Sequence, residues 1–158
     1  MGCSRELLMP RWATMMNTTI TDIFAVSEAE AIERARHLTR PTIIVSITSP
    51  GEPEIDFGSR PDLLGVLYLH FADIDYPDSC AMSLEDADAI LDFIERYSER
   101  YAQVIIHCYE GKSRSAGVAA ALQYLLLGRD SIHGDWRYRP NPLCYGKMME
   151  AARRRGWR

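Results

Sequence analysis

One cysteine of this chain stands where a working nucleophile would be placed. Cys108 follows Gln103–His107, a short apolar run typical of a buried strand, and the letters after it are YEGKSRS. An Ala/Leu-rich helix is expected over Ser115–Leu127, ended by Gly128. The cysteine therefore lies in a loop between a strand and the N-terminus of a helix.

Such a loop is suited to binding an anion. The backbone N–H groups from Tyr109 to Arg114 would converge on one point, where the helix dipole adds partial positive charge. Gly111 allows the tight turn. Arg114, six residues after Cys108, can fold back and bind two oxygens of a phosphate-like anion. A cysteine in that field is held as thiolate, so the residues predict a nucleophile aimed at phosphorus.

The other cysteines are Cys3, Cys80 and Cys144, and none has an arginine at this spacing. No two cysteines form a C-x-x-C pair, which argues against a zinc knuckle or a disulfide scaffold and favours a reducing, cytoplasmic location. Taken alone, Cys108 would be interpreted as a buried structural thiol. Cys80 and Cys144 are expected to be structural, with an oxidative disulfide to Cys108 as the alternative.

The elements around this loop alternate between strands and helices. Strands are predicted at 20–26, 42–48, 65–71 and 103–107, and helices at 29–38, 84–100, 115–127 and about 143–155. A surface loop is expected at 49–61 and an acidic loop at 73–81. This order predicts a single α/β domain with a mainly parallel sheet of four to five strands flanked by helices. Ligands of such sheets gather at the carboxyl ends of the strands.

Length and composition agree with one globular domain. The chain has 158 residues, 22 acidic and 18 basic, and 47% are hydrophobic. Residues 1–18 are expected to be irregular and 19–158 to form the domain. No apolar run is long enough to span a bilayer, and Glu6 stands where a myristoylation signal needs Ser or Thr. Mild acidity gives no support for nucleic-acid binding, and we expect a monomer without a membrane anchor.

The segment HCYEGKSRSAG, from His107 to Gly117, resembles the signature loop of the cysteine-dependent protein phosphatases, H-C-x-x-G-x-x-R-[ST]. It is most similar to the dual-specificity branch, H-C-x-x-G-x-S-R-S. A weaker resemblance in the order of strands and helices covers most of residues 20–158. The segment RPNP, residues 139–142, is similar to one found after the signature helix in bacterial members.

The resemblance implies a two-step reaction without metal or cofactor. Cys108 would attack the phosphoryl group, and water would then hydrolyse the phosphocysteine. Arg114 and the loop amides would stabilise the transition state. Ser115 would hydrogen-bond the cysteine sulfur, and His107 would hold the loop and favour the thiolate. The residues implied in substrate binding are Tyr109, Glu110, Gly111, Lys112, Ser113 and Arg114.

The leaving oxygen needs a proton, which the family supplies from an aspartate about thirty residues upstream. Asp75 lies 33 residues before Cys108, near the spacing of small dual-specificity enzymes. Asp73 lies 35 residues before it and has Pro77 four residues on, as in several members. Both stay candidates, with a slight preference for Asp73, and Asp78 fits less well. The alternative is a solvated acidic turn; a calcium loop is disfavoured because Pro77 and Asp78 stand in its centre.

The resemblance favours a phosphomonoesterase that acts on phosphotyrosine. A broader specificity would also include phosphoserine and phosphothreonine. One alternative substrate is a phosphoinositide or another non-protein phosphate ester: Lys112 favours it, whereas Tyr109 and Glu110 count against it. Another alternative is a pseudophosphatase that binds phosphorylated partners without turnover, although such proteins usually lack the cysteine or the arginine. Sulfur transfer fits the Arg114–Ser115 pair less well.

Overall fold

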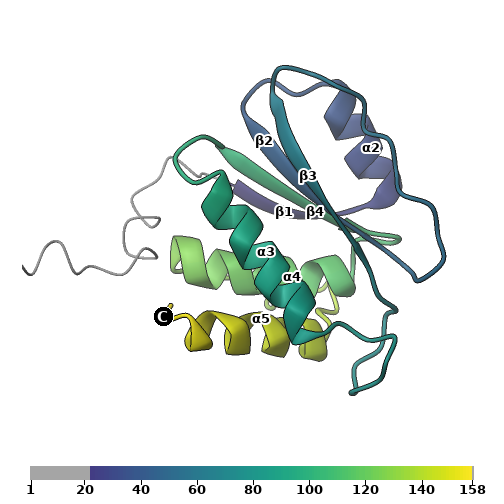
Figure 1. Cartoon of the computed structure of the whole chain (residues 1–158), viewed down its shortest axis with the longest axis vertical. Coiled ribbons are helices and arrows are strands. Elements are labelled where there is room, and N and C mark those ends of the chain that lie inside the picture. Colours follow the sequence, from purple (N-terminus) through teal and green to yellow (C-terminus); the bar gives the residue numbers. More distant parts are fainter. Residues whose placement is uncertain (1–21, 158) are drawn as a thin grey trace, which may run out of the picture.

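Four parallel strands form one sheet in the order β1-β4-β2-β3 (Figure 1). The structure is a computed structural model that describes residues 22–157. The predicted irregular segment 1–18 and the first residues of the strand expected from Ile20 lie outside this range. The strands are β1 (Asp22–Ser27), β2 (Thr42–Thr48), β3 (Leu63–His70) and β4 (Gln103–Cys108). The predicted α/β class with a parallel sheet is confirmed.

The two central strands are buried along their whole length. Every residue of β2 and β4 is buried, because helices or loops cover both faces of the sheet. Their β-branched runs suit this position, and β2 has the bounds that the sequence predicts. Strand β3 starts at Leu63, two residues earlier than expected, and Thr42 pairs with it just before a shift in register.

Helices cover the two faces of the sheet unequally (Figure 1). One face carries α2 (Glu28–Arg36), whose first turn is capped by the Ser27 hydroxyl, 3.1 Å from the Glu30 nitrogen. The opposite face packs against α3 (Leu84–Arg96) and α4 (Arg114–Leu122), and α5 (Pro142–Arg154) packs on both of these helices. This face holds the larger core.

The connection between β2 and β3 contains no helix. The sequence predicts a surface loop there, yet Phe57 is only 4% exposed and packs in the same cluster as Ala31, Ala35 and Ile105. The reason is topological: β2 and β3 are parallel neighbours, so the chain must cross one face of the sheet to return. Phe57 buries the part of that face that α2 leaves uncovered.

The C-terminal parts of two long helices differ from what the periodicity predicts. The helix expected to reach Arg100 ends at Arg96, where the chain turns through Glu99 with φ 71°. The helix expected over Ser115–Leu127 consists of α4 followed by a π-helical turn, η2 (Gln123–Leu127). Gly128 closes it at φ 69°, as the sequence predicts.

The carboxyl ends of the strands meet at one edge of the sheet. Ser27, the last residue of β1, pairs in register with Cys108, the last residue of β4. His107 pairs with Ser46 on β2, and the chain leaves β3 after His70. Because the strands are parallel, loops far apart in the sequence converge at this edge.

Candidate active site

The loop from Cys108 to Arg114, here called the signature loop, packs against the junction of β1 and α2. The Glu28 N–H donates to the Tyr109 carbonyl at 3.2 Å. Gly111 has φ 75°, and a Cβ at this position would lie 2.3 Å from both the Ser27 nitrogen and the Val26 carbonyl carbon. Only glycine fits here, since both the backbone conformation and the space exclude a side chain.

Most backbone N–H groups of the signature loop point to no acceptor within the part of the chain that the structure describes. No backbone hydrogen bond among the described residues takes up the N–H groups of Tyr109 through Ser113. The side chains of Tyr109, Glu110 and Lys112 are exposed, whereas the loop rests on buried Gly111. Unpaired N–H groups at a helix N-terminus can bind an anion.

Cys108 lies at the base of this loop and is 2% exposed. Its Sγ lies 3.1 Å from the hydroxyl oxygen of Ser115, in the first turn of α4. Because Ser115 is fully buried, its hydroxyl is shielded from water and the Cys108 sulfur is its neighbour. The contact joins the two residues for which the signature resemblance implies a shared role.

Arg114 is buried at 7% exposure, and one end of its guanidinium is anchored by other strands. Its Nη1 donates to the Phe71 carbonyl at 2.9 Å, just after β3, and to the Ser49 hydroxyl at 3.1 Å, just after β2. Its Nε is buried and has no hydrogen-bond partner among the described residues. A buried N–H without an acceptor is costly, and an oxyanion would satisfy it.

His107 supports the signature loop from below. Its Nε2 lies 2.6 Å from the Ser46 hydroxyl, its Nδ1 lies 3.3 Å from the Cys108 carbonyl oxygen, and its ring contacts the edge of Phe57. Burial lowers the pKa of His107. The hydrogen bond to the Cys108 carbonyl opposes this effect in part, and the positive charge of Arg114 adds a smaller lowering effect. The imidazole is therefore neutral at pH 7 and acts through hydrogen bonds.

The acidic loop after β3 reaches the signature loop. Asp73 Oδ1 accepts hydrogen bonds from the Ser113 hydroxyl at 2.7 Å and from Asn141 Nδ2 at 2.9 Å. A pocket of about 360 Å³ lies beside these contacts and is lined by Asp73, Asp75 and Arg139 among others. No hydrogen bond or ion pair joins the Asp75 side chain to another described residue. Asp78 instead accepts from the Cys80 nitrogen at 2.9 Å and stabilises a turn.

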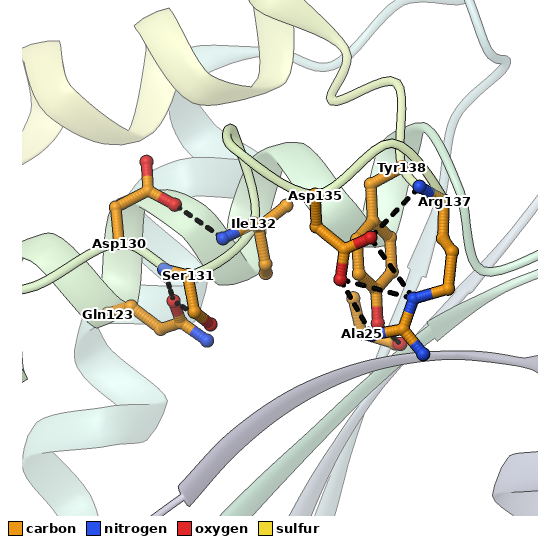
Figure 2. A network of polar contacts seen from close by, with 8 residues as sticks. All are labelled: Ala25, Gln123, Asp130, Ser131, Ile132, Asp135, Arg137 and Tyr138. Carbon is orange, nitrogen blue, oxygen red and sulfur yellow. Dashed lines mark hydrogen bonds and ion pairs between the residues drawn. The ribbon is translucent and has the colours of Figure 1, made fainter.

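A folded loop brings the segment before α5 to this site. Figure 2 shows its polar contacts: Asp130 accepts from the Ile132 nitrogen at 2.8 Å, and the buried Gln123 amide accepts from the Ser131 nitrogen at 2.8 Å. Further along, Asp135 pairs with Arg137 at 2.6 Å, and the Tyr138 hydroxyl donates to the Ala25 carbonyl at 3.4 Å (Figure 2).

These contacts fix where residues 139–141 lie. The Arg139 N–H donates to the Lys112 carbonyl at 2.9 Å, and the Asn141 N–H donates to the Ser113 carbonyl, also at 2.9 Å. The segment RPNP is therefore bonded directly to the signature loop. Asn141 itself is 3% exposed.

Comparisons of the sequence find no matching protein-family model and no matching curated protein. Solved structures do match. Human DUSP28 gives a TM-score of 0.58 at 18% identity, over 87% of this chain and 95% of that chain. The human tyrosine phosphatase-like serine/threonine/tyrosine-interacting protein gives 0.53 at 18%, over 80% and 84%. Tk-PTP, in its active form, gives 0.50 at 24%, over 88% and 92%.

The chain has the dual-specificity phosphatase fold. This confirms the fold implied by the resemblance of the signature loop, which is carried by β4 and α4 as expected. Within the described residues, no cluster of three or more His, Cys, Asp or Glu side chains is arranged to hold a metal ion. The described helices include none with the length and apolar character needed to cross a membrane.

In this phosphatase fold, Cys144 lies in the first turn of α5 behind the site. Burial raises the pKa of Cys144 to about 12, with a smaller contribution from the Asp73 carboxylate, so it stays a thiol. Cys80, Cys108 and Cys144 are all free, and Cys80 is exposed. Cys3 lies outside the described residues.

Sequence reasoning missed three residues that support the site. Ser46 binds His107, Ser49 binds Arg114, and Asn141 binds Asp73. The two serines occur in or next to a buried apolar strand, where a polar residue is unusual and thus a usable signal. Asn141 precedes a proline at a helix start, which predicts an N-cap and nothing more.

Proposed function

We propose that the chain is a metal-independent phosphomonoester hydrolase that acts on phosphotyrosine through a phosphocysteine intermediate. The observation that carries the proposal is the state of Arg114: Nη1 is fixed on two strand ends while the buried Nε has no partner within the described chain. The guanidinium is thereby oriented in advance for two oxygens of a phosphoryl group. It lies in the loop that carries Cys108 and the free amides.

In the first step the Cys108 thiolate attacks phosphorus, and the bond from phosphorus to the ester oxygen breaks. Arg114 and the loop N–H groups stabilise the charge on the three equatorial oxygens. The leaving oxygen takes a proton from an aspartate of the acidic loop, for which Asp73 and Asp75 are the candidates. In the second step water attacks the phosphocysteine and gives a proton to the aspartate carboxylate left by the first step. The phosphorus–sulfur bond breaks, inorganic phosphate is released, and the Ser115 hydroxyl, 3.1 Å from the sulfur, stabilises the departing thiolate.

The substrate class follows from how open the site is. Tyr109 is 69% exposed, Glu110 and Lys112 are exposed, and the pocket beside Asp73 is open to solvent. A phosphorylated protein side chain, including phosphoserine and phosphothreonine, can approach such a loop. The exposed Glu110 disfavours a highly charged phosphoinositide. A catalytic thiol also requires reducing conditions, which favours a cytoplasmic location.

The competing function is a binding module without turnover. One of the similar structures is described as a tyrosine phosphatase-like interacting protein, so the fold is compatible with both functions. Two observations favour the enzyme. Cys108 and Ser115 lie within hydrogen-bonding distance of each other, and Arg114 is held by the Ser49 hydroxyl and the Phe71 carbonyl.

The deciding experiment is hydrolysis of p-nitrophenyl phosphate in the presence of EDTA by the wild type and by Cys108→Ser. We expect turnover by the wild type and none by the variant. If the wild type does not turn over but binds a phosphotyrosine peptide, the protein is a pseudophosphatase. A panel of phosphopeptides and soluble phosphoinositides then defines the preferred ester.

A further inference from the structure

Asn141 makes more contacts than an N-cap needs. Its Oδ1 accepts from the backbone nitrogens of Leu143 and Cys144 at 2.9 and 3.1 Å, which caps α5. Its Nδ2 donates to Asp73 Oδ1 at 2.9 Å and to the Ile74 carbonyl at 3.1 Å. The buried amide is fully hydrogen-bonded, with one half serving the helix and the other serving the acidic loop.

Ser113 of the signature loop binds the same carboxylate oxygen. Its hydroxyl donates to Asp73 Oδ1 at 2.7 Å, and its carbonyl accepts from the Asn141 N–H at 2.9 Å. Asp73, Ser113 and Asn141 thus form a closed triangle, here called the latch. Ser113 and Asn141 lie 40 and 68 residues from Asp73 in the sequence. It joins the acidic loop, the signature loop and α5.

We propose that Asp73 and Asn141 are positioning residues that fix the acidic loop over the signature loop, and that Asp75 is the general acid. Asp73 Oδ1 is occupied by two donors that hold its side chain against the loop. Asp75, two residues further, faces the same pocket and is free of hydrogen bonds to other described residues. The latch therefore holds Asp75 in a pocket that Ser113 of the signature loop also lines, from which its carboxyl group would protonate the leaving ester oxygen. This inference rests on the proposed phosphatase function.

The asparagine variants separate the two roles of an aspartate. In Asp73→Asn the amide oxygen can still accept from Ser113 and Asn141, so a latch survives whereas an acid is lost. We expect Asp73→Asn to keep kcat within about threefold of the wild type and Asp73→Ala to lose about tenfold. Asp75→Asn should lose roughly 100-fold on phenyl phosphate and little on 2,4-dinitrophenyl phosphate, whose leaving group needs no proton.

Asn141→Asp tests the latch from its other side. The aspartate retains the cap of α5, because its carboxylate can accept from Leu143 and Cys144, but it loses both donors to the acidic loop and faces the Asp73 carboxylate. We expect a loss of about tenfold in kcat on phenyl phosphate. The double variant Asp73→Asn/Asn141→Asp reverses the polarity of the pair, and we expect it to recover most of that loss. Asn141→Ser, which also caps but carries no repelling charge, checks that the effect is loss of the donors.

Recovery in the double variant is decisive, because that protein has no carboxyl group at position 73. If Asp73→Asn alone abolishes turnover of phenyl phosphate but not of the dinitrophenyl ester, Asp73 is the acid and the proposal is overturned. It is overturned as well if neither aspartate variant changes the ratio of the two rates. Failure of the wild type to hydrolyse either ester would instead refute the phosphatase function. Thermal melts of each variant identify loss of folding.

Discussion

The sulfur of Cys108 lies 3.1 Å from the hydroxyl oxygen of Ser115, and both side chains are buried. A hydroxyl at this distance can donate to a thiolate that is leaving phosphorus. Its role would therefore fall in the second step of the reaction, in which the phosphocysteine breaks down.

Ser115→Ala should therefore slow breakdown of the intermediate more than its formation. A hydrogen bond to a charged group contributes about 1.5–3 kcal/mol, which corresponds to a kcat lower by roughly 10- to 150-fold. Rapid mixing with p-nitrophenyl phosphate should show a burst of nitrophenol followed by slow turnover. Ser59→Ala, at an exposed position, serves as the control. A proportional loss of burst and steady-state rates would contradict this role.

Arg114→Lys should lower kcat/KM by roughly 10²–10³-fold although the charge is kept. Lysine cannot bind the Phe71 carbonyl, the Ser49 hydroxyl and two phosphoryl oxygens at once. Ser49→Ala removes one anchor alone and should cost about tenfold. Steady-state kinetics of Arg114→Lys and Ser49→Ala check these values, and inhibition by inorganic phosphate measures how well each variant binds an anion. Equal kinetics for Arg114→Lys and the wild type would show that the guanidinium is not a phosphate ligand.

Gly111→Ala and Gly128→Ala provide a matched pair for the signature loop. Both glycines have positive φ, 75° and 69°, but an added Cβ meets backbone atoms at 2.3 Å only at Gly111 and nothing within 4 Å at Gly128. We expect Gly128→Ala to cost about 1–2 kcal/mol of stability and to stay active. Gly111→Ala should cost roughly 3 kcal/mol or more and lose activity. Urea unfolding and kinetics check this; equal losses for both would argue against the contact with β1.

The buried His107 predicts a stability that declines in mild acid. Its pKa in the folded protein lies below the ordinary value of 6.5, so under acidic conditions the unfolded chain binds a proton that the folded one does not. The stability that the neutral His107 side chain contributes is complete above about pH 6.5, and it is lost as the pH falls through the pKa of His107 in the folded protein. The melting temperature of the wild type between pH 7.5 and 5 should drop more steeply than that of His107→Gln.

The matched comparison is His37→Gln, because the His37 side chain is 71% exposed. This variant should follow the wild-type curve. If His107→Gln and the wild type depend on pH in parallel, the imidazole does not titrate as its burial implies.

Local sequence was sufficient to predict most of the helices and strands and to place Cys108 and Arg114 at the junction between β4 and α4. The residues around Cys108–Arg114 predict this loop locally, since a β-branched strand, a glycine turn and an Ala-rich helix follow one another in the sequence. The buried run Thr42–Thr48 likewise has the bounds that its residue types predict. Parallel connections through helices then left few arrangements for the sheet.

What only the tertiary structure decided are the contacts between distant loops. No local pattern shows that Asn141 binds Asp73, that Arg114 is held by the Phe71 carbonyl, or that Phe57 is buried beside His107. These partners come together because parallel strands bring all their carboxyl ends to one edge, where packing of α5 and the return loop sets the distances. The sequence by itself therefore predicted Cys108 as the nucleophile and the signature loop as its anion site. The neighbours that orient Arg114 and Asp73 depend on how the whole chain packs.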